Sequence, residues 1–167
     1  MRHRLASVLS IMLIPIACGQ MNAQHGAASS ADEVAGRIEG VASVIDGDTI
    51  EIHGQRIRLS GFDSPESGKR CGGTNVYQQA AIYLSDRIGR KTVTCAVTGK
   101  SYDRAVAICS VDGTDLGTIM VSAGWARDWP KYSHGTYAGA EADARASRQG
   151  IWNLECPEDL WGDRSYQ

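Results

Sequence analysis

Apolar and polar residues alternate along two short neighbouring segments of the chain. Residues 50–53 read I-E-I-H, and residues 56–60 read R-I-R-L-S. A period of two is typical of a strand with one buried face. The Gly54-Gln55 pair between the segments is a turn signal. The pattern therefore predicts a β-hairpin in which the two segments run back beside each other.

Apolar periodicity elsewhere predicts three more strands and three helices. The first of these strands is expected to begin near Arg37, and the other two to cover about 91–98 and 104–111. The helices are expected at about 76–89, 115–123 and 137–149. Gly89, Gly124 and Gly150 stand where the helices should end. Five strands with helices between and after them predict a small closed barrel. The fold class is therefore α+β with a mainly β core.

Acidic residues lie at both ends of the predicted hairpin. Asp48 precedes the first strand, whereas Asp63 and Glu66 follow the second, so the hairpin brings them near one another and near Arg58. Carboxylates so close repel each other unless a cation lies among them, and oxygen ligands on loops suit Ca²⁺ or Mg²⁺. The alternative for Asp48 is a turn residue that bonds its own backbone. An EF-hand is excluded, because Ile57 occupies the twelfth position, where Glu is required.

These residues belong to a longer set of motifs that resembles the staphylococcal nuclease (thermonuclease) family. The motifs are V-I-D-G-D-T at 44–49, R-x-x-x-x-D-S-P-E at 58–66, Y-D-R at 102–104, G-W at 124–125 and G-I-W at 150–152. Their order and spacing hold over roughly 37–153. The resemblance implies that the barrel is an OB-fold and that the chemistry is phosphodiester hydrolysis.

The resemblance also implies roles for the acidic residues. Asp48 and Asp63 match the carboxylate ligands of a single Ca²⁺, with the backbone carbonyl of Ser64 as a third ligand. Glu66 matches the family's candidate general base, and Pro65 before it restricts the backbone. The alternative for Glu66 is an exposed loop glutamate.

Arg58 and Arg104 match the two arginines that clamp phosphate in this family. A guanidinium is planar, always charged and bidentate towards phosphate. The alternative for either arginine is a surface salt bridge. Tyr102 matches a tyrosine near the phosphate of the nucleotide in this family. The alternative for Tyr102 is an aromatic residue in a turn with no role in binding.

Other substrate contacts are less direct. Pro130 occupies the place of a second nucleotide-contacting tyrosine, so Trp129 or Tyr132 is the candidate for stacking on a base. Plain packing is the alternative for Trp129. Lys69 and Arg70, in the Gly-rich loop after Glu66, are candidates for phosphate contacts, with a solvated loop as the alternative.

The chain begins with a basic and then apolar segment that predicts export. At 167 residues and 43 % hydrophobic content, it has room for one domain with a core. No run reaches the roughly 18 apolar residues of a spanning helix. The predicted parts are a signal peptide at 1–19, a flexible leader at 20–36, the nuclease-like domain at 37–155 and a tail at 156–167. Cys18 is a candidate lipidation site, and ordinary signal cleavage is the alternative. The protein is expected to be periplasmic or secreted, and monomeric.

Four cysteines remain after the signal segment, and four in an oxidising compartment predict two disulfides. Of three connectivities we favour Cys95 with Cys109, because both lie in predicted neighbouring strands. Cys71 with Cys156 then follows by elimination. Free buried thiols are the alternative. A zinc site is not expected, since no Cys-x-x-Cys pair is present.

The charge limits how the protein meets nucleic acid. There are 17 basic and 19 acidic residues, a formal net charge of −2, and loss of the signal segment removes only basic ones. Since phosphate contacts supply most non-specific affinity, a broad electrostatic grip on duplex DNA is not expected. The prediction is a Ca²⁺-dependent nuclease acting on DNA and RNA, preferably single-stranded, that leaves 3′-phosphate ends. The alternative is a catalytically silent barrel that binds nucleic acid or a cell-surface partner.

Overall fold

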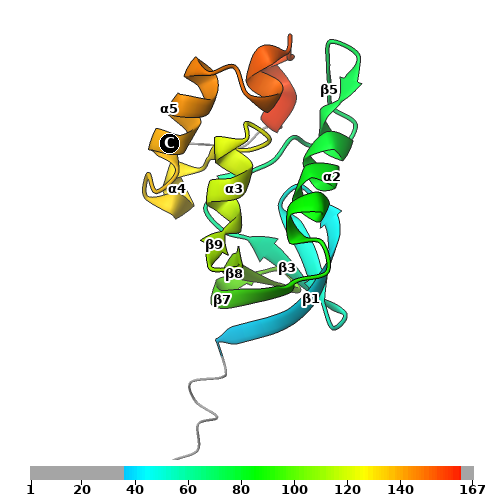
Figure 1. The fold of residues 1–167 in the computed structure, drawn as a ribbon, viewed down its shortest axis with the longest axis vertical. Helices are drawn as coiled ribbons and strands as arrows, with labels where there is room; N and C mark the ends of the chain where they lie inside the picture. The colour runs from blue at the N-terminus through cyan, green and yellow to red at the C-terminus, as the bar shows by residue number, and fades with distance from the viewer. Residues whose placement is uncertain (1–35, 163–167) are drawn as a thin grey trace, which may run out of the picture.

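Five strands close into the predicted barrel in a computed structural model that describes residues 36–162. They are β1 (Arg37–Asp46), β2 (Thr49–Ile52), β3 (Gln55–Leu59), β7 (Thr92–Ser101) and β8 (Arg104–Val111). The order is β3-β2-β1-β7-β8, with antiparallel neighbours, and parallel pairing of β3 with β8 closes the ring. The α+β class and the OB-fold barrel are therefore as predicted, and the barrel occupies the lower half of Figure 1.

The predicted hairpin is β2–β3. His53 and Gly54 both have positive φ, 52° and 78°, at its turn. Two left-handed residues in a two-residue loop match the right-handed twist of the strands they join. The resulting register pairs Ile50 with Ile57 and Thr49 with Arg58. The turn therefore fixes which residues stand opposite each other at the open end of the hairpin.

Three helices coincide with the predicted ones, and short elements accompany them. The helices are α2 (Val76–Ile88), α3 (Leu116–Ser122) and α5 (Ala138–Ala146). The short elements are β4 (Phe62–Asp63), β5 (Arg70–Cys71), β6 (Thr74–Asn75), β9 (Thr114–Asp115), β10 (Arg127–Asp128), α4 (Pro130–Ser133), η1 (Gly150–Asn153) and η2 (Glu158–Trp161). The helix α4 has four residues, too few to show a helical period, so the apolar pattern did not predict it.

The helices cover one end of the barrel and enclose the main core. The interior-facing Ile50, Ile52 and Ile57 of the barrel are fully buried, and Leu84 of α2 and Met120 of α3 pack onto them. Figure 1 shows α2 and α3 standing over the strands, with α5 and the last turns of the chain beyond them. Among helices in the described part of the chain, none has the length and apolar content to cross a bilayer.

A second, smaller core lies at the far end of the helices. Cys71, Ile151, Leu160 and Trp161 are buried in it. The segment expected as a tail, 156–167, is thus part of the folded domain as far as it is described. Its buried residues, Leu160 and Trp161, are adjacent in the sequence. Two adjacent residues give no periodic pattern from which their burial could have been predicted.

Both predicted disulfides are present. Cys95 and Cys109 stand opposite each other in the β7–β8 ladder, and Cys71 is joined to Cys156 across 85 residues. The predicted signal segment with Cys18, and the leader up to residue 35, lie outside the described residues.

Candidate active site

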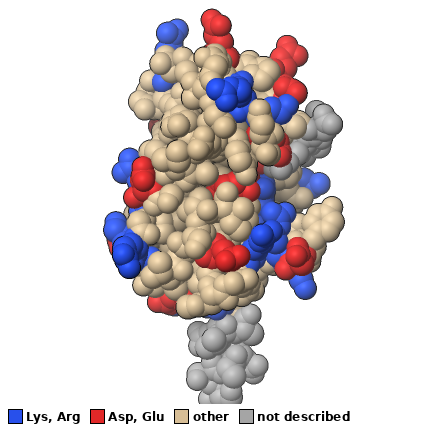
Figure 2. Space-filling model, turned by 90° about the vertical axis from the view of Figure 1, so that its right-hand side faces the viewer, with Lys and Arg blue, Asp and Glu red and all other residues tan. Residues whose placement is uncertain are grey.

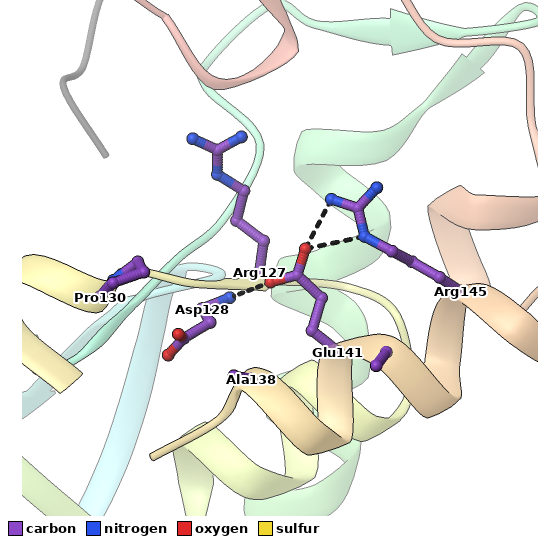
Figure 3. Close-up of a pocket in the computed structure, with 7 residues that line it drawn as sticks. Arg127, Asp128, Pro130, Ala138, Glu141 and Arg145 are labelled. Atoms are coloured by element: carbon purple, nitrogen blue, oxygen red, sulfur yellow. Dashed lines mark hydrogen bonds and ion pairs between the residues drawn. The ribbon is translucent and has the colours of Figure 1, made fainter. Parts of the chain in front are cut away.

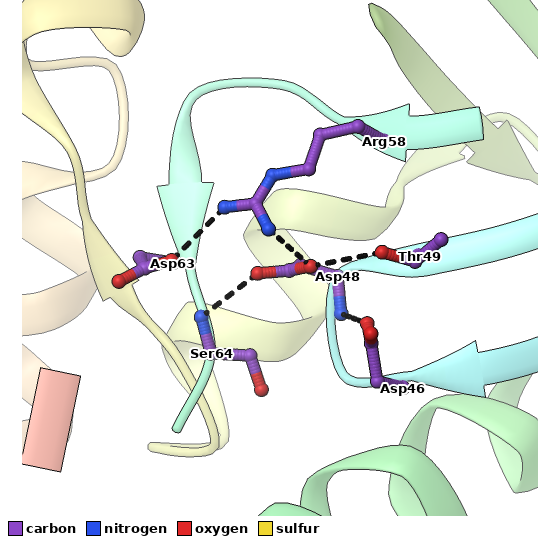
Figure 4. A network of polar contacts seen from close by, with 6 residues as sticks. All are labelled: Asp46, Asp48, Thr49, Arg58, Asp63 and Ser64. Carbon is purple, nitrogen blue, oxygen red and sulfur yellow. Dashed lines mark hydrogen bonds and ion pairs between the residues drawn. The ribbon is translucent and has the colours of Figure 1, made fainter. Parts of the chain in front are cut away.

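A buried network joins one arginine to two aspartates. Arg58 Nη1 donates to Asp48 Oδ1 at 2.5 Å, and Nη2 donates to Asp63 Oδ1 at 2.9 Å. The side chains of Arg58, Asp48 and Asp63 are 14 %, 6 % and 0 % exposed. Figure 4 shows the guanidinium between the two carboxylates. Charges this deeply buried require partners of opposite sign, so the three side chains hold each other in place.

The hairpin brings this network together, as predicted. Leu59 N donates to Asp48 O at 2.8 Å, which ties the end of β3 to the start of β2. Asp46 Oδ1 accepts from Asp48 N at 3.0 Å, so Asp46 has the turn role and the Asp48 side chain is left for the site. Gly47 lies between them, and a Cβ there would be 1.9 Å from Ser64 Oγ. Only glycine allows so close an approach.

The candidate catalytic residues line one small hollow of about 170 Å³. Arg58, Arg104 and Glu66 all face it, and Asp48 and Ser64 form part of its wall. The structure therefore places the predicted general base and both predicted phosphate-clamping arginines around a single space. Asp63 does not line the hollow itself, but its ion pair with Arg58 holds it directly behind this wall.

A larger aromatic hollow of about 590 Å³ shares both arginines. Besides Arg58 and Arg104, Tyr102, Trp129 and Tyr132 line it. Trp129 and Tyr132 meet edge to face with ring centroids 4.7 Å apart, and Tyr102 is 92 % exposed. The two predicted stacking candidates, Trp129 and Tyr132, thus lie around the same space as Tyr102, which was predicted to lie beside the nucleotide. We call the smaller space, beside Asp48 and Glu66, the acidic hollow and the larger one the aromatic hollow. Arg58 and Arg104 line both of them.

Lys69 and Arg70 are not brought to either hollow. Lys69 forms an ion pair with Asp159, and Arg70 donates to the carbonyl of Gly73 in its own β5–β6 turn. Their charge suggested phosphate contacts, but the structure uses it locally. Lys100, which was not singled out, lines the aromatic hollow instead.

Tyr77 is a second site residue, after Lys100, that the sequence analysis did not predict. It lines the acidic hollow from the first turn of α2. Burial raises the pKa of its phenol, and the charges of Asp46, Asp48 and Glu66 raise it further. The apolar period predicted the helix, yet whether its first turn reaches the hollow depends on the tertiary angle of α2. No local signal carried that information.

The oxygen-rich wall fits a hard cation. Asp48 and Asp63 are buried carboxylates, and Ser64 Oγ beside them is buried with no hydrogen-bond partner. Within residues 36–162, no group of three or more His, Cys, Asp or Glu side chains is close enough to hold a metal alone. Two carboxylates would therefore need backbone or water oxygens to complete a shell, and Ca²⁺ accepts such mixed ligands.

Glu141 supports the strand that pairs with the one carrying Asp63, and Figure 3 shows the Glu141 carboxylate bonded to Asp128 and Arg145. Asp63 of β4 pairs with Arg127 of β10. Glu141 Oε2 accepts from Asp128 N of β10 at 2.8 Å, and Glu141 Oε1 accepts from Arg145 Nε at 2.8 Å. Glu141 on α5 thus supports the Asp63 strand through one intervening strand.

Charge on the molecular surface is mixed. Figure 2 shows basic and acidic side chains interspersed on the face that it presents. This agrees with the small formal net charge of −2. On this face, attraction for an anionic ligand has to come from local groups such as paired arginines rather than from a broad basic surface.

Fold and site define a class of protein: a closed five-stranded barrel with buried carboxylates and two arginines that line the hollows beside them. Residues 56–154 match the family model described as staphylococcal nuclease homologue. The chain belongs to this family.

Two relatives extend the comparison. The chain is 35 % identical over 130 residues to the succinoglycan biosynthesis protein ExoI of Rhizobium meliloti (strain 1021), covering 71 % of this chain and 66 % of ExoI. It is 31 % identical over 140 residues to a micrococcal nuclease of Shigella flexneri, covering 72 % of this chain and 76 % of that protein.

Proposed function

We propose that the protein is a nuclease that hydrolyses phosphodiester bonds of DNA and RNA. The observation that carries this proposal is the position of Arg58 and Arg104 between two hollows. One hollow offers carboxylates and the other offers aromatic rings. A nucleotide has the same division, with a phosphate that needs cationic donors and a base that stacks on aromatic rings. The family and the micrococcal nuclease relative support the same activity.

Each residue of the acidic hollow then has a task. Arg58 and Arg104 bind the phosphate and stabilise the negative charge that grows in the transition state. Glu66 accepts the proton of the attacking water, which requires it to face the same hollow as the phosphate. Asp48 and Asp63, with Ser64, would hold Ca²⁺, which supplies charge neutralisation at the phosphoryl oxygens.

The aromatic hollow supports a preference for unpaired nucleotides. Trp129, Tyr132 and Tyr102 offer ring faces and edges that a stacked base inside a duplex does not reach. The formal net charge of −2 and the mixed charge on the face shown in Figure 2 give little hold on a long duplex. We therefore assign single-stranded or frayed DNA and RNA as substrates, with 3′-phosphate products. The two disulfides support action outside the cytoplasm, in the periplasm or after secretion, and the protein is taken to act as a monomer.

Cleavage assays with controlled metal content test this proposal. The oxidised protein would be incubated with single-stranded DNA, duplex DNA and RNA of one sequence, in Ca²⁺ or in a Ca²⁺ chelator. We expect cleavage only in Ca²⁺, fastest on the single strands. The products should carry 3′-phosphate ends, which terminal transferase extends only after a phosphatase has exposed the 3′-hydroxyl. A protein that cuts none of the three in Ca²⁺ or Mg²⁺ contradicts the nuclease assignment.

Saccharide binding is the second candidate function. The relative named for succinoglycan biosynthesis favours it, and aromatic side chains such as Trp129 and Tyr132 also stack on sugar rings. Under this alternative the protein binds an acidic polysaccharide and cleaves no nucleic acid. Calorimetric titration with acidic polysaccharide, beside the cleavage assay, separates the two functions.

A further inference from the structure

The segment Cys156–Gly162, here called the C-terminal clamp, lies against the loop that carries Glu66. Glu66 N donates to Leu160 O at 3.3 Å. Lys69, three residues after Glu66, forms an ion pair with Asp159. A Cβ on Gly162 would lie 3.3 Å from Glu66 Cγ, so the clamp also reaches the glutamate side chain. The clamp therefore contacts the backbone, the side chain and the neighbouring charge of the candidate base.

The clamp is itself fixed to the domain. Trp161 is 7 % exposed, packs on Trp152 with ring centroids 6.1 Å apart, and has the Arg127 guanidinium over its ring at 5.0 Å. The Cys71–Cys156 disulfide ties the start of the clamp to β5, just after the loop. A covalent link at one end and a buried aromatic anchor at the other leave the clamp few alternative positions.

The loop at residues 65–69 has little regular structure of its own. Its backbone closes one turn, through Lys69 N to Glu66 O at 3.1 Å, and its other described backbone bond goes to the clamp. Hydrogen bonding at Glu66 N, near the amino-terminal end of this loop, restricts where the Glu66 side chain points. Catalytic groups need placement within a fraction of an ångström, and a 1 Å error costs on the order of 10²-fold in rate.

We infer that the C-terminal clamp is a positioning device for Glu66, and that Asp159 acts as a positioning residue through Lys69. The inference rests on the proposed function for the role of Glu66, whereas the clamp contacts themselves do not. An Asp159→Asn change removes the ion pair and leaves the buried anchor intact. Because exposed ion pairs contribute little to global stability, the variant should fold normally.

The matched control is Asp112→Asn. Asp112 pairs with Lys91 and is 66 % exposed, the same exposure as Asp159, but it lies in the β8–β9 turn. Both variants lose one exposed ion pair, and only one of them loses a contact to the Glu66 loop. Asp159→Glu keeps the charge and should retain most of the wild-type rate.

The test combines amide hydrogen exchange with steady-state kinetics. For Asp159→Asn we expect faster exchange at the Glu66 amide and unchanged exchange in the barrel, together with a kcat lower by about three- to ten-fold at constant KM. In a Glu66→Gln background the same change should cause no further loss of rate, since it acts through Glu66. The control should match wild type in both measurements.

Three results would overturn the inference. Unchanged exchange at the Glu66 amide in Asp159→Asn would show that Asp159 does not restrain the Glu66 loop. An equal loss of rate with and without Glu66→Gln would show a general structural effect instead. A wild-type protein without nuclease activity overturns the proposed function and with it the positioning role. The exchange data then tell the two failures apart, because they report the clamp without any substrate.

Discussion

Arg58 Nη1 lies 2.5 Å from Asp48 Oδ1, inside a pocket that leaves the aspartate side chain 6 % exposed. The same guanidinium reaches Asp63 with its other terminal nitrogen. Arg58 is thus both the counter-charge of the acidic wall and one of the two arginines facing the aromatic hollow. A phosphate or a cation that enters the site competes with this network, so occupancy of the site and the pairing of Arg58 are coupled.

Removal of the Arg58 charge should destabilise the protein in a cation-dependent way. Arg58→Met removes one cationic partner from each of two buried carboxylates, and loss of one partner of a buried pair costs about 3–5 kcal/mol. We expect chemical unfolding in a chelator to show a loss of this size. Millimolar Ca²⁺ should recover part of it by binding the freed carboxylates. Equal losses with and without Ca²⁺ would show that Asp48 and Asp63 do not bind the ion.

Gly47 provides a steric test of the acidic wall. Gly47→Ala puts a Cβ 1.9 Å from Ser64 Oγ and 2.9 Å from Ala80 Cβ, so the Asp46–Asp48 turn has to move. We expect about 1–3 kcal/mol of destabilisation and a large loss of cleavage.

The matched control for this change is Gly139→Ala in α5. A Cβ there meets nothing within 4 Å, and the position is helical. Alanine in a helix interior is favoured over glycine by roughly 0.5–1 kcal/mol, so this variant should be slightly more stable and fully active. A Gly47 variant as active as the control would refute the placement of Ser64 against the turn.

Much of this arrangement could be predicted from local sequence. The alternation around Gly54 specified the β2–β3 hairpin, and the register of the hairpin brings Asp48 next to Arg58. The cysteine pairing followed from two strands of one ladder, Cys95 opposite Cys109. These features depend on contacts between chain segments that are close in sequence or joined by a tight turn.

The rest depends on tertiary packing that leaves no periodic signal. Tyr77 reaches the acidic hollow only because α2 crosses the barrel at a particular angle. Trp161 is buried by Trp152 and Arg127, residues brought to it by the whole helical layer. Lys69 carries a charge that suits phosphate, yet in the folded protein this charge is paired with Asp159. A single sequence shows which residues are charged or apolar but not which of several partners is nearest.

Glu141 should stabilise the site without touching it. It is 15 % exposed and bonds both the β10 backbone and Arg145. Glu141→Ala leaves a buried amide of Asp128 unpaired, which costs about 1–3 kcal/mol, and loosens the strand beside Asp63. We expect a lower thermal midpoint and weaker Ca²⁺ binding.

Glu39→Ala is the control for this change, because the Arg37–Glu39 pair is exposed and lies at the start of β1. It should alter neither the thermal midpoint nor Ca²⁺ binding. If Glu141→Ala lowers the midpoint and leaves Ca²⁺ affinity at the wild-type value, β10 does not position Asp63.

Tyr137 should govern stability at alkaline pH. Burial raises the pKa of its phenol well above the ordinary value, and the charge and hydrogen bond of Asp115 raise it further. The folded state therefore holds this proton at pH values where the unfolded chain, with a tyrosine pKa of about 10, has lost it. The stabilisation is complete below about pH 10 and declines as the pH rises towards the folded pKa.

Unfolding measured between pH 8 and pH 11.5 tests this assignment. The wild-type free energy of unfolding should fall above about pH 10, and Tyr137→Phe should fall less steeply. Tyr102→Phe, at a residue 92 % exposed, should follow the wild-type curve. Parallel curves for wild type and Tyr137→Phe would contradict the role of Tyr137.

The role of Glu66 as general base is tested by the single-turnover cleavage rate of Glu66→Gln on single-stranded DNA in Ca²⁺. Glu51→Gln is the control, since Glu51 lies on the outer face of β2 near Arg56. We expect Glu66→Gln to cleave on the order of 10²–10⁴-fold more slowly at unchanged substrate affinity, the range for loss of a general base. Glu51→Gln should cleave at the wild-type rate. A Glu66→Gln protein that cuts as fast as wild type would show that Glu66 is not the general base.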